Sequence, residues 1–323
     1  MNLSIIIALL NEQESLPELV ELIRQTLKEP LPINNNQPLE YEILFIDDGS
    51  TDQSWSFIAQ EADRDPHIHG IRFRRNYGKS AALYTGFEAA KGDVVITMDA
   101  DLQDSPSEIP ALYTLIADGS YDLVSGWKKK RKDGWLTKNL PSKIYNRTAR
   151  RVTGIPLHDM NCGLKAYRSD VVKSIEVYGE MHRYIPYLAK TAGFTRIGEK
   201  VVVHQARKYG KSKFGLNRFV NGYLDLISLW FLTKFGKKPM HIFGFLGTLT
   251  FMAGGIIAIW LIVQKLYFQT HRLPFRAVTD QPLFYLALLA VVVGLQLFLA
   301  GFLGEMISRN AADRNRYNIR EWK

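Results

Sequence analysis

Residues 92–104 read Gly92-Asp93-Val94-Val95-Ile96-Thr97-Met98-Asp99-Ala100-Asp101-Leu102-Gln103-Asp104, an apolar run that leads directly into three carboxylates and an amide. The apolar run predicts a strand, and like charges crowded at its end repel one another unless a cation lies between them. Carboxylate and amide oxygens suit Mg²⁺ or Mn²⁺, hard ions that often hold substrate phosphates as well. A solvated acidic turn is the alternative interpretation. The position after a strand, within an α/β pattern, favours the metal site.

Strand-like and helix-like stretches alternate from residue 1 to about residue 205. The expected strands are Leu3–Leu10, Tyr41–Ile46, Ile71–Phe73, Val94–Met98 and Tyr121–Ser125. The expected helices include Glu14–Leu27, Ser54–Asp63, Lys79–Ala90 and Ser107–Asp118. This alternation predicts βαβ units and an α/β domain with a mostly parallel sheet.

Polar side chains follow three of these expected strands, at Asn11-Glu12, Asp47-Asp48 and Asp99-Ala100-Asp101. Ligands on parallel sheets bind beyond the carboxyl ends of the strands. We therefore expect these side chains to converge on one edge of the sheet and to form an active site. Two lysine-containing segments resemble the end of a Walker loop, but Phe73 and Gln205 stand where its first glycine is required. A kinase, an ATPase and a dinucleotide-dependent dehydrogenase are therefore disfavoured.

Composition points to an anionic partner. The 323 residues carry a net charge of +9 and a pI of about 9.4, which suits nucleic acid, phosphate ligands or an acidic membrane surface. The single cysteine, Cys162, excludes an internal disulfide and fits a reducing compartment. The apolar first ten residues have no basic segment before them, so we interpret them as a strand and not as a signal peptide.

Two stretches near the end of the chain, Met240–Gln264 and Gln281–Gly304, contain no Lys, Arg, Asp or Glu. Each exceeds the roughly 20 residues needed to cross a bilayer. Basic residues flank the pair on its outer sides: Lys234, Lys237, Lys238, Arg309, Arg314, Arg316, Arg320 and Lys323. The positive-inside rule therefore predicts a multi-pass protein of the inner (plasma) membrane, with a cytosolic domain and both ends in the cytoplasm.

The expected organisation follows from these signals. We place a cytosolic domain at 1–214, spans at 239–264 and 282–305, a loop at 265–281 and a basic cytosolic tail at 306–323. Apolar and aromatic residues recur at helical spacing between Leu216 and Phe235, which predicts an interfacial amphipathic helix at 215–238. An ordinary core-facing helix is the alternative.

Five motifs occur in a fixed order: Asn11-Glu12, Asp47-Asp48-Gly49-Ser50-Thr51-Asp52, Asn76-Tyr77-Gly78-Lys79, Asp99-Ala100-Asp101-Leu102-Gln103-Asp104 and Asp159-Met160-Asn161-Cys162-Gly163-Leu164-Lys165. Together they resemble the family 2 glycosyltransferases, which have a GT-A fold. With the two spans, the chain is similar to polyprenyl-phosphate glycosyltransferases: dolichol-phosphate mannose synthases, aminoarabinose transferases and especially the bactoprenol glucosyltransferases (GtrB). The family often has proline and an aromatic residue where Ala8 and Leu10 stand here.

This resemblance implies a metal-dependent, inverting transfer of a hexose from a nucleotide diphosphate to a long isoprenoid phosphate. The implied nucleotide-sugar-binding residues are Glu12, Asp47, Asp48, Asp99, Arg207 and Lys213, the last two closing over the donor phosphates. The implied metal ligands, for Mg²⁺ or Mn²⁺, are Asp99, Asp101 and Gln103. For Arg207 and Lys213, an exposed basic turn before the membrane is the alternative.

Asp159 is the catalytic residue that the resemblance implies, as a base. A phosphate monoester is already largely dianionic at neutral pH, because its second pKa is about 6, so little proton abstraction is needed. Asp159 would then orient the acceptor or stabilise the sugar as it gains positive charge. It is also placed to cap the turn before Asn161-Cys162-Gly163.

A basic helix is expected from Pro141, a residue suited to a first helical turn. Its cations recur on one helical face and are the candidate ligands of the acceptor phosphate: Lys143, Arg147, Arg150 and Arg151. The run Lys128-Lys129-Lys130-Arg131-Lys132 is a second candidate, although such runs are more often solvated or attract anionic lipids.

The leading functional hypothesis is transfer of glucose from UDP-glucose to undecaprenyl phosphate. Mannose and aminoarabinose donors share these motifs, and a non-catalytic membrane scaffold with a retained fold is the alternative from another class. Nucleic acid is not an expected partner, because the basic residues cluster around the membrane segments. The small residues Gly244, Gly247, Gly254 and Gly255 leave a homo-oligomer open, since they permit close helix approach.

Overall fold

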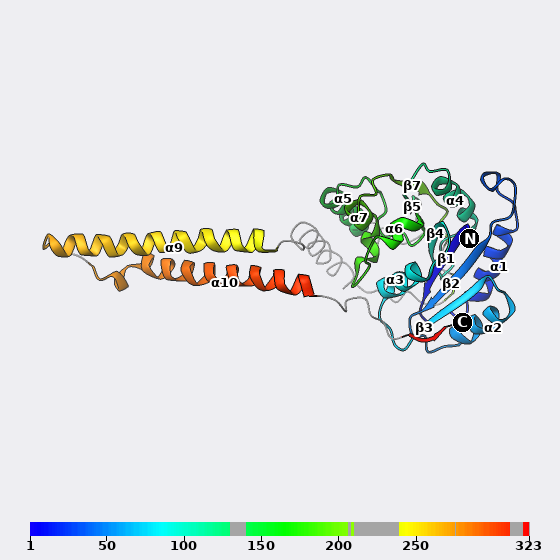
Figure 1. The fold of residues 1–323 in the computed structure, drawn as a ribbon, viewed down its shortest axis with the longest axis horizontal. Coiled ribbons are helices and arrows are strands. Elements are labelled where there is room, and N and C mark those ends of the chain that lie inside the picture. Colours follow the sequence, from blue (N-terminus) through cyan, green and yellow to red (C-terminus); the bar gives the residue numbers. More distant parts are fainter. Residues whose placement is uncertain (130–139, 206–207, 210–238, 275, 311–318, 323) are drawn as a thin grey trace. The chain divides into compact units, whose positions relative to one another are not determined.

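The computed structural model describes residues 1–129, 140–205, 208–209, 239–274, 276–310 and 319–322. Within these ranges the chain forms two compact units (Figure 1). The first is built on one β-sheet, and the second is a pair of long helices, α9 (Pro239–Thr270) and α10 (Pro282–Asn310). The interfacial helix expected at 215–238 lies outside the described residues.

The sheet has the strand order β7-β5-β6-β4-β1-β2-β3-β8 in the described part of the chain. Its first four strands along the sequence are β1 (Leu3–Leu9), β2 (Tyr41–Asp47), β3 (Ile68–Phe73) and β4 (Val94–Asp99). β1 pairs in parallel with both β2 and β4, and β2 pairs in parallel with β3. The predicted α/β fold with a mostly parallel sheet is confirmed. Because β1 is covered on both faces, it reads as a nearly continuous apolar run.

The remaining strands are β5 (Leu123–Trp127), β6 (Lys165–Arg168), β7 (Ile197–Val201) and β8 (Ile319–Trp322). β6 lies antiparallel between β4 and β5, and β8 pairs antiparallel with β3 at the edge of the sheet. β5 begins two residues later than expected, and Asp122 immediately before it pairs with Arg168 and Arg196. β6, β7 and β8, each of four or five residues, were not expected from the sequence.

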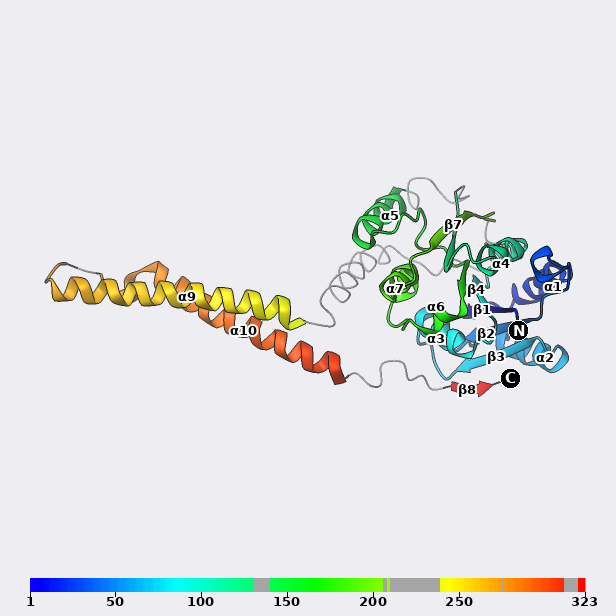
Figure 2. The same cartoon turned by 45° about the horizontal axis from the view of Figure 1, so that its top comes forward.

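The helices of this unit are α1 (Leu16–Leu27), α2 (Ser54–Arg64), α3 (Lys79–Ala89), α4 (Ile109–Ala117), α5 (Leu140–Thr153), α6 (Ser169–Lys173) and α7 (Ile185–Thr191), with 3₁₀ turns η1 (Pro32–Asn34), η2 (Pro106–Glu108) and η4 (Met181–Tyr184). α1, α2 and α4 cover one face of the sheet, and α3 covers the other (Figures 1 and 2). Alternation along β1 divides its side chains between these layers, with Ile5 and Ile7 in the core under α1 and Ile6 toward α3.

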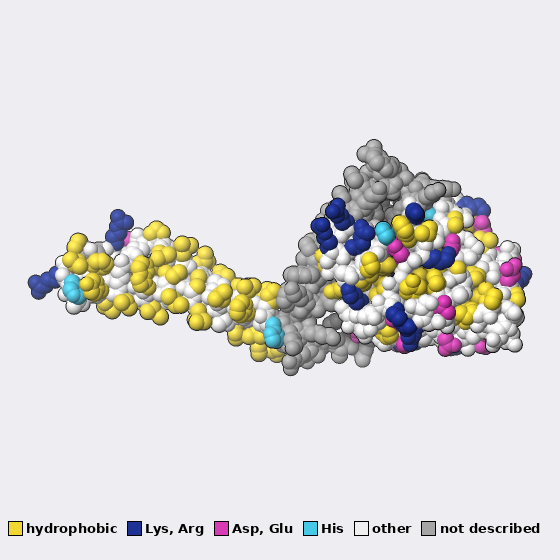
Figure 3. Space-filling model, turned by 90° about the horizontal axis from the view of Figure 1, so that it is seen from above, with side chains coloured by type: hydrophobic (Ala, Val, Ile, Leu, Met, Phe, Trp, Pro, Cys, Tyr) yellow, Lys and Arg dark blue, Asp and Glu magenta, His cyan; other side chains and the backbone are white. Residues whose placement is uncertain are grey.

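The second unit consists of α9 and α10, which run side by side with the 3₁₀ turn η5 (Val278–Asp280) before α10 (Figures 1 and 2). Both contain a stretch long and apolar enough to cross a membrane, Met240–Thr270 and Pro282–Gly304. Hydrophobic side chains cover the visible face of this unit (Figure 3). Exposed apolar side chains at this density are typical of a lipid-facing surface.

Glycines let the backbones of α9 and α10 approach closely. A Cβ on Gly247 would lie 2.6 Å from the carbonyl oxygen of Gly294, and one on Gly254 would lie 2.7 Å from that of Ala287. Both positions are therefore used for packing within the chain, as small residues are in helix pairs of membranes. A Cβ on Gly255 would meet nothing within 4 Å. Among the glycines that permit a homo-oligomer, Gly255 therefore has free space next to its Cα within the chain.

Close packing of α3 on the sheet gives a test of the fold. A Cβ on Gly86 would lie 2.5 Å from Cγ2 of Ile6, so Gly86→Val overpacks the layer between α3 and β1. We expect this change to lower the free energy of unfolding by about 1–3 kcal/mol, measured as a lower thermal midpoint of the full chain in detergent. Glu88→Val places the same residue on the exposed side of α3 and controls for helix propensity. Equal losses for the two variants would contradict this packing.

Candidate functional site

The loops after β1, β2 and β4 meet at one edge of the sheet. Leu9 pairs with Asp47 across β1 and β2, while Ala8 pairs with Asp99 across β1 and β4, so the two aspartates end the strands that flank β1. The loop after β1 is tied to the loop after β2, because Asn11 accepts the backbone N–H of Thr51 at 2.8 Å through its side-chain oxygen. The structure thus brings together the three polar segments that follow these strands.

Glu12 and Asp47 both lie at the junction of the first two loops. Glu12 is partly exposed, and its backbone N–H donates to the Ser54 hydroxyl at 3.0 Å. Asp47 is fully buried; its Oδ1 accepts the Ser50 N–H at 2.8 Å, and its Oδ2 lies 3.4 Å from Nε of Arg72. Burial raises the pKa of the Asp47 carboxyl despite these partners.

Asp48 holds the loop that leads into α3. Its two carboxylate oxygens accept the backbone N–H groups of Tyr77 at 2.7 Å and of Gly78 at 2.9 Å. Burial nevertheless raises the pKa of Asp48 to about 6. Because Lys79 is the first residue of α3, this clamp fixes where the Lys79 side chain begins.

Asp99, at the end of β4, forms an ion pair with the ammonium group of Lys79. Burial alone would raise the pKa of Asp99, but Lys79, Lys128 and Lys165 hold it well below its usual range. Gly163 approaches the same carboxylate so closely that a Cβ there would collide with it. Asp99 is therefore ionised, enclosed by lysines and still about one-third exposed at its side chain.

The rest of the loop after β4 folds back on itself. Asp101 is mostly buried and accepts the backbone N–H of Gln103 at 3.1 Å, with Leu102 in the left-handed region at φ 58°. Asp104 is fully buried and pairs with Lys128 at 2.7 Å. Burial raises the pKa of Asp104 although Lys128 opposes this.

The donor set at this edge suits a hard divalent ion. The described residues contain no group of three or more His, Cys, Asp or Glu side chains placed to hold a metal. Mg²⁺ is usually held by one or two carboxylates together with water and substrate phosphates, and not by an all-protein cage. Asp99, Asp101 and the amide of Gln103 offer oxygen atoms of this kind, so the residues present fit such an ion.

Asp159 caps its own turn, as one of the sequence interpretations allowed. Its side chain is 2 % exposed, and Oδ1 accepts the backbone N–H of Asn161 at 3.1 Å. The next residue ties this turn to α5, because the Met160 N–H donates to the side-chain oxygen of Asn146 at 3.4 Å. The Asp159 turn and the basic helix are therefore held together.

Neighbouring polar groups stiffen the same region. The ring of His158 pairs with Glu199 and stacks on Trp127 with centroids 4.2 Å apart. His158, to which the sequence assigned no role, is thus held by the ends of β5 and β7.

The expected acceptor-phosphate cations lie along α5. Arg147 and Arg151 are exposed and Arg150 is partly exposed, while Ala149 on the same helix is buried. Lys143 also belongs to α5, but its side chain lies outside the described residues, as do Arg207 and Lys213. Figure 3 shows one face of the sheet domain, on which Lys and Arg side chains lie among acidic and hydrophobic ones.

Lys128 and Lys129, the described part of the basic run that was a second candidate for the acceptor phosphate, contact other side chains of the sheet domain. Lys128 turns inward to Asp104 and is only 11 % exposed at its side chain, because the fully buried carboxylate requires a counter-ion. Lys129 lies over the ring of Trp127 at 5.5 Å. Residues 130–132 are outside the described ranges.

Sequence reasoning assigned no role to Lys79, Lys128 or Lys165 at the carboxylate edge. Lys79 and Lys165 belong to the ordered motifs, so their place in those motifs was a usable signal. A second signal was the excess of carboxylates after β4, which in a folded chain must be matched by nearby cations. No local pattern could have shown that Lys128 is the partner of Asp104.

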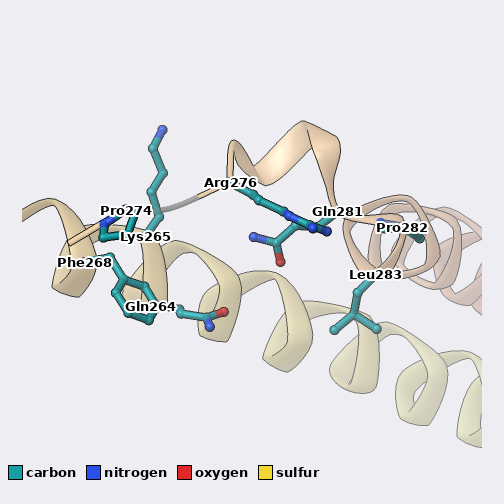
Figure 4. Close-up of a pocket in the computed structure, with 8 residues that line it drawn as sticks. All are labelled: Gln264, Lys265, Phe268, Pro274, Arg276, Gln281, Pro282 and Leu283. Carbon is teal, nitrogen blue, oxygen red and sulfur yellow. The ribbon is translucent and has the colours of Figure 1, made fainter.

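A cavity of about 380 Å³ lies elsewhere, between the end of α9 and the start of α10 (Figure 4). It is lined by Gln264, Lys265, Phe268, Pro274, Arg276, Gln281, Pro282 and Leu283. Its polar groups are two cations and two amides, with no carboxylate among the residues that line it. The carboxylate edge of the sheet contributes nothing to this cavity.

Comparisons with known proteins agree with this geometry. Residues 4–176 match the model of the family described as glycosyl transferase family 2. The chain is 34 % identical over 311 residues to a dodecaprenyl-phosphate galacturonate synthase of Rhizobium johnstonii, covering 96 % of this chain and 88 % of the relative. It is 35 % identical over 322 residues to an undecaprenyl-phosphate 4-deoxy-4-formamido-L-arabinose transferase of Proteus mirabilis, covering 98 % and 93 %.

Among solved structures, the fold is similar to a glucosyl-3-phosphoglycerate synthase from Mycobacterium tuberculosis, solved with Mn²⁺, uridine diphosphate and glucosyl-3-phosphoglycerate. The TM-score is 0.54 at 16 % identity, and the match covers 72 % of this chain and 79 % of that one. At this identity the likeness concerns the fold alone, and it confirms the GT-A architecture.

The raised pKa of Asp48 predicts a pH dependence of stability. An unfolded aspartate has a pKa near 3.8 and the folded Asp48 one of about 6, so between these values the folded chain binds more protons. Stability from this group therefore falls as the pH rises through that window. We expect the thermal midpoint of wild type, relative to Asp48→Asn, to fall between pH 4.5 and 7.5, by the equivalent of about 2 kcal/mol.

Asp52→Asn is the matched control. Hydrogen bonds from Ser54 and Gln13 hold the pKa of Asp52 below its usual value although burial opposes them. The contribution of ionised Asp52 to stability is thus already complete above pH 4.5. The difference in thermal midpoint between wild type and Asp52→Asn should therefore not change from pH 4.5 to 7.5. A flat difference for Asp48→Asn as well would refute the raised pKa.

Proposed function

The chain belongs to glycosyltransferase family 2, and we propose that it transfers a hexose, glucose from UDP-glucose, to the phosphate of undecaprenyl phosphate. It is a transferase of the polyprenyl-phosphate type, as both relatives named above are. Their names specify a galacturonate and a formamido-arabinose, so the donor sugar is the part of this proposal that needs direct measurement. Mannose and aminoarabinose donors are the alternatives within the same reaction.

The carboxylate edge with its lysines carries the proposal. A nucleotide diphosphate is a polyanion, and two carboxylates alone would repel it. Lys79, together with a divalent ion held by Asp99 and Asp101, would make this site attractive to the diphosphate. Bound by Asp99, Asp101 and Gln103, Mg²⁺ or Mn²⁺ would neutralise the leaving diphosphate.

The neighbouring loops would orient the rest of the donor. Glu12, Asp47 and Asp48 lie at the ends of β1 and β2, where the nucleoside would bind. Arg207 and Lys213, which follow β7 in the sequence, would add charge-assisted hydrogen bonds to the same phosphates. These groups together would stabilise the nucleotide diphosphate as it departs.

The acceptor phosphate would approach from α5. Lys143, Arg147, Arg150 and Arg151 would bind this dianion, and the Asn146 link keeps α5 next to the Asp159 turn. In the proposed step a phosphate oxygen attacks the anomeric carbon as the bond to the diphosphate oxygen breaks, so the configuration inverts. Because the acceptor is already largely ionised, Asp159 would orient it or stabilise the sugar and need not remove a proton.

The apolar helices α9 and α10 fit a lipid acceptor. Two helices able to cross a bilayer would keep the enzyme at the membrane, which the isoprenoid chain cannot leave. With basic residues flanking the outer ends of both spans, we propose an inner-membrane protein whose catalytic domain is cytosolic.

Sugar transfer is the direct test. The full chain in detergent is incubated with undecaprenyl phosphate, Mg²⁺ or Mn²⁺ and labelled UDP-glucose, UDP-galacturonate, GDP-mannose or a UDP-aminoarabinose. We expect a labelled lipid product from UDP-glucose that disappears when a chelator is added. A lipid product from another donor would refute glucose as the donor sugar but not the reaction. If the folded protein gave no lipid product from any donor, the proposed reaction would be refuted.

Charge reversal on α5 tests the acceptor assignment. Each charged hydrogen bond to phosphate contributes about 1.5–3 kcal/mol, so Arg147→Glu with Arg150→Glu should raise the apparent KM for undecaprenyl phosphate at least tenfold. The KM for the nucleotide sugar should stay nearly unchanged. Lys28→Glu with Arg64→Glu makes the same charge change at two exposed positions, the residue after α1 and the last residue of α2. An equal rise in both KM values would refute the assignment.

A further inference from the structure

Lys79 stands at an unfavourable place for a cation. It is the first residue of α3, where the helix dipole favours negative charge, and the first turn of α3 contains no acidic side chain. Its ammonium group instead reaches Asp99 at the end of β4. The ion pair therefore offsets two unfavourable interactions. One is between the Lys79 ammonium and the helix dipole, and the other is between the Asp99 carboxylate and its acidic neighbours.

The other two lysines near Asp99 are held in place. Lys128 pairs with the fully buried Asp104, and its side chain is 11 % exposed. Lys165 is 3 % exposed and donates to the backbone oxygen of Cys162. The Lys79 side chain is 35 % exposed, on a flexible four-carbon stem. Of these three ammonium groups, that of Lys79 has the freedom to leave.

Asp99 already has cationic neighbours without any added ion. Lys79, Lys128 and Lys165 all act on its carboxylate, and Lys79 pairs with it directly. A divalent cation added alone would lie beside the Lys79 ammonium and would be repelled. A diphosphate would relieve the repulsion between the divalent cation and Lys79, because it offers the Lys79 ammonium another partner of opposite charge.

We propose that Lys79 is a positioning residue that occupies Asp99 until the donor binds, and that the donor diphosphate draws Lys79 away and so frees Asp99 to hold a divalent ion. The proposal rests on the proposed function only in taking a diphosphate as the ligand. Its consequence is that divalent ion and nucleotide bind with strong positive coupling, each raising the affinity for the other by the same factor.

Mn²⁺ binding to the full chain tests this inference without any sugar transfer. The dissociation constant is measured by electron paramagnetic resonance with and without UDP, and with pyrophosphate to remove the dependence on the base, each corrected for Mn²⁺ bound by these ligands alone. Wild type should bind Mn²⁺ at least tenfold more tightly when UDP is present. Lys79→Met should bind Mn²⁺ at least tenfold more tightly than wild type without UDP, and the gain on adding UDP should shrink.

Three variants make the result specific. Lys79→Arg keeps the cation and should keep the wild-type coupling. Lys91→Met removes an exposed lysine just beyond the other end of α3 and should bind Mn²⁺ as wild type does. Asp99→Asn combined with Lys79→Met should lose the added affinity, since the gained site belongs to Asp99.

The outcomes separate this inference from the proposed function. Unchanged or weaker Mn²⁺ binding by folded Lys79→Met without UDP would overturn it, and so would an absence of Mn²⁺ binding by wild type in the presence of UDP. Coupled binding in wild type, together with tighter Mn²⁺ binding by Lys79→Met without UDP, would support it even if no sugar reached a lipid. In that case the proposed reaction would fail while the role of Lys79 stood.

Discussion

Mutual repulsion among the carboxylates after β4 is the constraint on which the rest of this site depends. Asp99, Asp101 and Asp104 fall within six residues, and Asp104 is fully buried. A buried carboxylate without a counter-ion is strongly destabilising, so the fold must bring cations to this edge from elsewhere. It does so from three directions: Lys79 from the start of α3, Lys128 from the end of β5 and Lys165 from β6.

The sheet order explains how these lysines arrive. β6 lies between β4 and β5, so it places Lys165 opposite Thr97, two residues before Asp99, and sets the end of β5 nearby. The clamp of Asp48 on Tyr77 and Gly78 fixes the start of α3 on the other side of β1. The antiparallel strand β6, inserted between β4 and β5, is thus what brings Lys165 to this edge.

Sequence periodicity was sufficient for the parallel half of the fold. β1, β2 and β4 are buried apolar runs that end in polar residues, and the four expected helices end within two residues of their observed limits. The edge where Asp47 and Asp99 meet followed from that pattern. β6 and the inward turn of Lys128 did not, because both depend on pairing with distant residues, and a lysine in a basic run looks the same whether it is solvated or buried against a carboxylate.

Burial of Asp159 bears on how the acceptor is used. A side chain that is 2 % exposed and already accepts the Asn161 N–H is poorly placed to exchange a proton with water. An alcohol acceptor would need a base that can pass its proton on to water, and Asp159 would serve this role poorly. A phosphate acceptor would arrive largely deprotonated at neutral pH, so in the proposed reaction the Asp159 turn would need only to be rigid. In the proposed reaction, the Asn146 contact would couple the position of this turn to α5, which carries Arg147 and Arg150.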